Sequence, residues 1–87
     1  MTASLSDISQ AFDDLISGSK SREAVAAWAT SLREAEDARR IRYEPASEEK
    51  RIWNAILYLT GVDLKSSPTD YLHSKNDFLS YRQKAGV

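Results

Sequence analysis

The sequence predicts an all-α protein, a small four-helix bundle with an extra one-turn helix before the last helix. Apolar residues recur at helical spacing in three long segments, and Ser, Gly and Pro residues stand where these segments begin or end. The 87 residues are 41% hydrophobic and 29% charged, a composition typical of globular proteins. We therefore expect a single helical domain over residues 1–87.

The first predicted helix covers residues 5–17, with Ser4 or Ser6 as its cap and Gly18 at its end. Its apolar face consists of Leu5, Ile8, Phe12, Leu15 and Ile16. Aspartates occupy the opposite face, which is either a solvated surface or an acidic strip that docks a partner: Asp7, Asp13 and Asp14.

The second predicted helix begins after the capping residue Ser21 and carries an apolar stripe of Val25, Trp28, Ala29, Leu32 and Ala35. Charged residues then replace the stripe, and two i,i+4 pairs are expected, Arg33 with Asp37 and Glu36 with Arg40. A basic cluster follows, Arg39, Arg40 and Arg42. It can contact phosphate, but the interleaved acidic residues favour a salt-bridged helix end.

Pro45 interrupts the helices, and Ser47 is expected to cap the third one. In this segment one face consists of Ile52, Ala55, Ile56 and Leu59, while Trp53 and Leu57 widen it. So broad an apolar surface predicts a central helix with neighbours on two sides. The alternative is partial exposure of Trp53 or Tyr58 at a partner site. Gly61 and Val62 match a helix-ending motif.

Two start signals follow in the C-terminal region. Ser67-Pro68 with Asp70 predicts the one-turn helix, and Ser74 with Asp77 predicts the terminal helix. The bottom of the core is expected to be closed by Leu72, Phe78 and either Leu79 or Tyr81.

The chain lacks the residues that metal sites, cofactor sites and catalytic sites usually need. The chain has no Cys, one His (His73) and three isolated Gly, so we expect no metal site, no cofactor and no enzymatic activity. A formal net charge of −1 gives no overall basic field toward nucleic acid, so we expect no direct binding to it, with a local basic patch as the open alternative. Without a signal peptide or a long apolar run, we expect a cytoplasmic protein with no membrane contact.

A pattern of aromatic and Gly residues over residues 20–80 resembles that of small bacterial immunity proteins. It consists of Trp28, then W53-x3-L57-x3-G61-V62-D63-L64, then Y71-L72-H73-x3-D77-F78. The resemblance implies a compact helical protein that binds and neutralises a cognate toxin without reaction or cofactor. The alternative is a small helical regulatory or adaptor protein that binds another protein.

Tyr43, Glu44, Glu48 and Glu49 form the candidate partner site, since an aromatic residue with carboxylates suits the basic active site of a nuclease toxin. The glutamates at the helix start equally suit its dipole. Asp13 and Asp14 are the second acidic candidates. We expect the protein to be a monomer or a weak dimer.

Overall fold

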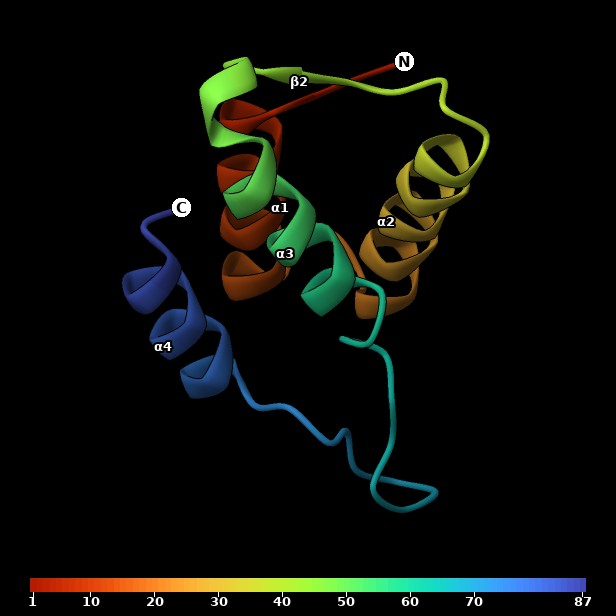
Figure 1. Cartoon of the computed structure of the whole chain (residues 1–87). Helices are drawn as coiled ribbons and strands as arrows, with labels where there is room; N and C mark the ends of the chain where they lie inside the picture. Colours follow the sequence, from red (N-terminus) through yellow and green to blue (C-terminus); the bar gives the residue numbers. More distant parts are fainter.

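The computed structural model describes residues 1–87 and is mainly helical (Figure 1). In chain order its elements are β1 (Thr2–Ser4), α1 (Leu5–Ser17), α2 (Arg22–Asp37), β2 (Arg42–Glu44), the 3-10 helix η1 (Ala46–Glu48), α3 (Glu49–Leu59) and α4 (Lys75–Ala85). The four predicted main helices are confirmed. None of the helices is long and apolar enough to cross a membrane.

The core lies where α3 packs against both α1 and α2, while α4 packs against α1 (Figure 1). Ile52, Ile56 and Leu59 have no exposed surface, as predicted for a central helix. Trp28, also expected in this core, is instead half-buried and packs against its edge. The indole lines a pocket between α1 and α2.

A two-stranded parallel sheet makes the strictly all-α prediction wrong. β1 pairs with β2 so that Ala3 lies opposite Tyr43, and the methyl group of Ala3 is fully buried. Each strand has three residues, too few to show the alternation of apolar and polar residues by which a strand is recognised. The sheet fixes the segment after α2 against the start of the chain.

Serine side chains cap three helices, as predicted. Ser4, Ser21 and Ser74 each accept a hydrogen bond from a backbone N–H of the first helical turn. Gly18 ends α1 at a φ of 79°, a left-handed conformation that a residue without Cβ adopts at little cost. Ser47 is not a cap. It lies inside η1, and α3 begins at Glu49 without a side-chain cap.

The segment between α3 and α4 contains no one-turn helix. Ser67 and Asp70 instead form a turn, in which the Asp70 N–H donates to Ser67 Oγ over 3.1 Å. This satisfies the same groups as a helix cap without starting a helix. Leu72, predicted in the core, is exposed, because its backbone pairs with Leu64 at the surface. Phe78 alone of the α4 residues is fully buried.

Candidate functional site

The end of α2 turns sharply through an arginine. Arg39 has a φ of 56° and is the only non-glycine residue with a positive φ. The Arg40 N–H donates to the Ala35 carbonyl (2.7 Å) and the Arg39 N–H donates to the Glu36 carbonyl (2.9 Å). These two bonds form the Schellman motif, in which Gly usually occupies the left-handed position. A strained conformation is therefore kept at a residue with a long cationic side chain, and such strain is often found at functional sites.

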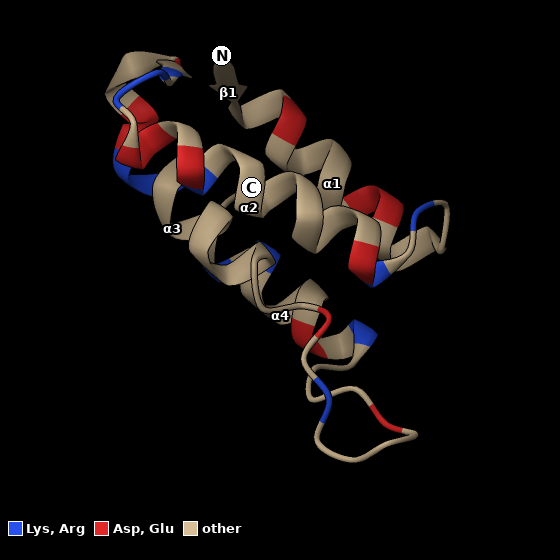
Figure 2. Ribbon diagram, turned by 90° about the vertical axis from the view of Figure 1, so that its right-hand side faces the viewer, with Lys and Arg blue, Asp and Glu red and all other residues tan.

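The next residues are held by the sheet. Arg42 lies opposite Thr2 in the parallel pair, and its N–H donates to the Met1 carbonyl over 2.8 Å. The helix end and the sheet thus restrain both ends of a short segment that carries three basic side chains. We call Arg39, Arg40 and Arg42 the arginine corner. Figure 2 shows these basic residues along the segment that leaves the end of α2, close to acidic residues of that helix.

The arginine corner is not salt-bridged, which corrects the expectation from sequence. All three side chains are exposed, and none belongs to the four ion pairs of the structure. The predicted pairs Arg33–Asp37 and Glu36–Arg40 are also absent. The left-handed turn at Arg39 takes Arg40 off the helix, where i,i+4 geometry no longer applies.

Glu36 has a different partner, the hydroxyl group of Tyr43. The Tyr43 Oη donates to Glu36 Oε2 over 2.7 Å. Burial and then this bond to a carboxylate raise the pKa of Tyr43 well above its usual range. Tyr43 is therefore a link between β2 and α2, with its hydroxyl group already engaged.

The predicted acidic site is only partly assembled. Tyr43, Glu44 and Glu49 line a shallow depression of about 350 Å³, together with Arg42. Glu48 instead pairs with Arg51 over 3.2 Å. Arg42, a basic residue of the arginine corner, therefore lies among the aromatic residue and carboxylates of the predicted partner site.

Asp13 and Asp14 do not form one acidic strip, because they lie in different environments. Asp13 is exposed and forms an ion pair with Arg82. Asp14 is buried, accepts a hydrogen bond from Gln10 Nε2 (3.1 Å) and lies 3.5 Å from Lys20 Nζ. The sequence pattern placed Asp14 on the polar face, but the turn after α1 and Lys20 cover it.

His73 lies against Tyr58, with 5.4 Å between the ring centroids, and its Nδ1 is 4.0 Å from the Asp77 carboxylate. No group of three or more His, Asp or Glu side chains is arranged to hold a metal ion.

Fold and site together define a small helical protein whose second helix ends in an exposed cationic corner. A family model described as YxzC DNA-binding protein matches residues 2–84, and the chain belongs to this family. An uncharacterised protein, YxzC of Bacillus subtilis (strain 168), is 36% identical over 63 residues, which cover 72% of this chain and 46% of the relative. The chain thus spans about half the length of that relative. No solved structure matches.

The family overturns the resemblance to immunity proteins and the function drawn from it. The matching model is that of a DNA-binding family rather than a toxin-neutralising one, so the toxin partner and the exclusion of nucleic acid were wrong. The exclusion failed because net charge averages over the whole surface, whereas phosphate contacts depend on a local cluster. A regulatory role, the alternative left open by the sequence, agrees better with this family.

Proposed function

We propose that this protein binds DNA through the arginine corner, as a small regulatory protein without catalytic activity. The observation that supports the proposal is the set of three exposed arginines, on a restrained segment, without an acidic partner in an ion pair. Arginine presents a planar fork of donors that matches phosphate oxygens. The description of the family as DNA-binding supports the same conclusion. The proposal includes the cytoplasmic location expected from the sequence, since bacterial DNA lies there.

Phosphate contacts would supply most of the binding energy. Helices α2 and α3 are separated by residues 38–48, which is longer than the short turn of a helix-turn-helix motif. The corner instead presents Arg39, Arg40 and Arg42 from a turn and a strand. Such contacts position a protein on the duplex and carry no base sequence by themselves.

The test is the salt dependence of duplex binding, measured by fluorescence anisotropy with a short labelled DNA. Each phosphate contact contributes about 0.9 to the slope of log K against log salt, so three contacts contribute about 2.7. Replacing Arg39, Arg40 and Arg42 by Ala should weaken binding at low salt and lower the slope by about that amount.

A single Arg40→Ala variant is compared with Lys75→Ala as its matched control. Lys75 is exposed, forms no ion pair and begins α4 at the far end of the molecule from β2 (Figure 1). Its removal should change the slope less than removal of Arg40. Absence of duplex binding at low salt, or an unchanged slope in the triple variant, would reject the proposal.

A further inference from the structure

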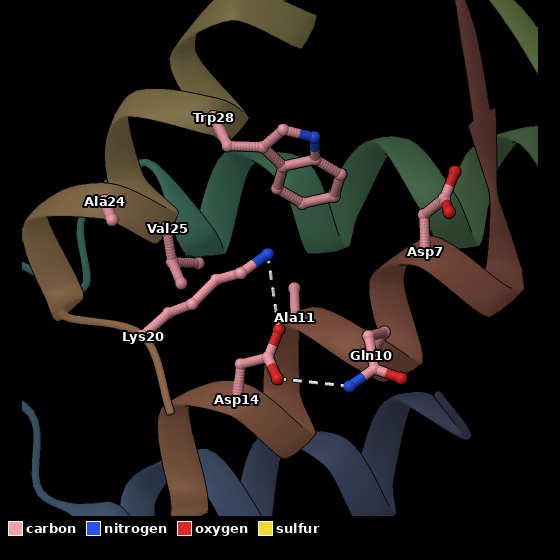
Figure 3. A pocket seen from close by; sticks show the side chains of 8 residues that line it. All are labelled: Asp7, Gln10, Ala11, Asp14, Lys20, Ala24, Val25 and Trp28. Atoms are coloured by element: carbon pink, nitrogen blue, oxygen red, sulfur yellow. Dashed lines mark hydrogen bonds and ion pairs between the residues drawn. The ribbon is translucent and has the colours of Figure 1, made fainter. Parts of the chain in front are cut away.

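The largest cavity of the molecule lies between α1 and α2, apart from the arginine corner. Its volume is about 390 Å³, within the range of small-molecule sites. Trp28 and Val25 of α2 line one side, and Gln10 and Asp14 of α1 line the other (Figure 3). An aromatic wall thus faces a carboxylate across a space that α3 and α4 do not fill.

Asp14 is the charged group of this pocket. The residue is 9% exposed, and each of its carboxylate oxygens has one neighbour, Gln10 Nε2 at 3.1 Å and Lys20 Nζ at 3.5 Å. A carboxylate offers about four acceptor positions, so Asp14 can accept a further donor. Low exposure also strengthens its attraction for a cation.

Lys20 already supplies a cation to this carboxylate. Figure 3 shows its side chain pointing into the pocket, with the ammonium group between the Trp28 ring and Asp14. Yet the Lys20 side chain is 63% exposed and belongs to the turn between the two helices. Lys20 can therefore move its ammonium group into water, and an incoming cation that takes its place keeps the buried Asp14 carboxylate paired.

We propose that this pocket binds a small organic ammonium compound, whose charged group replaces that of Lys20 beside Asp14 and whose apolar part packs against Trp28 and Val25. The carboxylate accepts charge-assisted hydrogen bonds from the ammonium group, and the indole of Trp28 offers a broad apolar surface to the rest of the compound. Asp7, also in the lining, adds negative charge at the rim.

The test uses 2-phenylethylammonium as the probe and the indole N–H signal of Trp28 in NMR as the readout. The chain has two tryptophans, and Trp53→Phe assigns the signals. The Trp28 signal should shift with saturation on addition of the probe. The neutral analogue 2-phenylethanol should bind about tenfold more weakly or not at all, since it lacks the charge.

Lys20→Met tests whether the Lys20 ammonium group competes with the probe for Asp14. It removes the internal competitor and should tighten probe binding severalfold, whereas Lys65→Met, at an exposed lysine of another loop, should leave it unchanged. Asp14→Asn should weaken binding about tenfold. If Asp14→Asn does not fold, as judged by circular dichroism, the comparison of Lys20→Met with Lys65→Met tests the proposal by itself. No saturable shift, or equal affinity in wild type and Lys20→Met, overturns the proposal.

Discussion

The Tyr43 hydroxyl donates a hydrogen bond to Glu36 Oε2 over 2.7 Å and so joins β2 to the last turn of α2. Glu36 thus contacts Tyr43 and forms no ion pair with Arg40, because the left-handed turn at Arg39 takes Arg40 off the helix. A tertiary contact over seven residues thus replaces the local ion pair. It also restrains the segment that carries the arginine corner.

Tyr43→Phe should lower the free energy of unfolding near neutral pH by about 1.5 kcal/mol, the order expected for a hydrogen bond to a charged group. The loss should disappear in strong alkali. The folded pKa of Tyr43 is raised above its unfolded value of about 10. This contribution is therefore complete below about pH 10 and falls as pH rises beyond it.

Urea unfolding of wild type and Tyr43→Phe between about pH 8 and about pH 11 measures this difference. Tyr71→Phe is the control, since its hydroxyl group also donates to a carboxylate, that of Glu23, but at an exposed position. Its effect on stability should be smaller. A constant gap between wild type and Tyr43→Phe across the alkaline range would contradict the predicted linkage.

Ile56 and Leu57 are neighbours on α3 with opposite environments. Ile56 has no exposed surface, whereas Leu57 is 42% exposed. Ile56→Ala should therefore cost about 2–5 kcal/mol of unfolding free energy, and Leu57→Ala should cost much less. Urea or thermal unfolding of the two variants measures this difference, and comparable losses would show that α3 is not the central helix.

The helices could be predicted because their signals are local. Ile52, Ile56 and Leu59 repeat at the helical period, and Ser74 with Asp77 forms the capping box expected three residues apart. The pairing of β1 could not be predicted, since Ala3 is buried by a partner about forty residues away and has no strand signal of its own. Leu72 was misplaced for a similar reason, because its pairing with Leu64 is tertiary.

The arginine corner was visible in the sequence but was interpreted as neutralised. Whether Arg40 pairs with Glu36 depends on the conformation of Arg39, and only Gly or Asn would have indicated a left-handed residue there. The cavity beside Trp28 had no sequence signal at all. Helical periodicity places Trp28 on the core side, and the structure shows that it packs at the edge of the core, where it lines the pocket.

Arg82 should be essential for the docking of α4. Phe78 is the only buried residue of this helix, Tyr81 stacks on Phe12 and Tyr58 at the edge of the core, and the polar contacts of Arg82 add to these apolar ones. Arg82 Nη2 donates to Ser9 Oγ over 2.8 Å, its Nε donates to the Val87 carbonyl over 2.9 Å, and it pairs with Asp13. Arg82→Met should cost about 2 kcal/mol. It should also increase amide hydrogen exchange in α4.

Lys84→Met is the matched control for Arg82→Met, since Lys84 is a basic residue of the same helix, is exposed and forms no ion pair. Its exchange pattern should equal that of the wild type. Unchanged protection of α4 in Arg82→Met would show that the apolar contacts of Phe78 and Tyr81 are sufficient to dock the helix.

Arg39→Gly should separate stability from DNA binding. Gly adopts a φ of 56° without the strain that a side chain adds, so this variant should be about 0.5–1 kcal/mol more stable than wild type in urea unfolding. The same substitution removes one cation of the arginine corner. Duplex affinity should therefore fall, and the slope of log K against log salt should decrease by about 0.9.

Arg40→Gly is the control: it removes the same charge at a residue without a positive φ, so it should weaken DNA binding similarly but lower stability. Should Arg39→Gly be less stable than wild type, the arginine side chain itself would be needed to hold the turn. Strain would then no longer support a functional role for this residue.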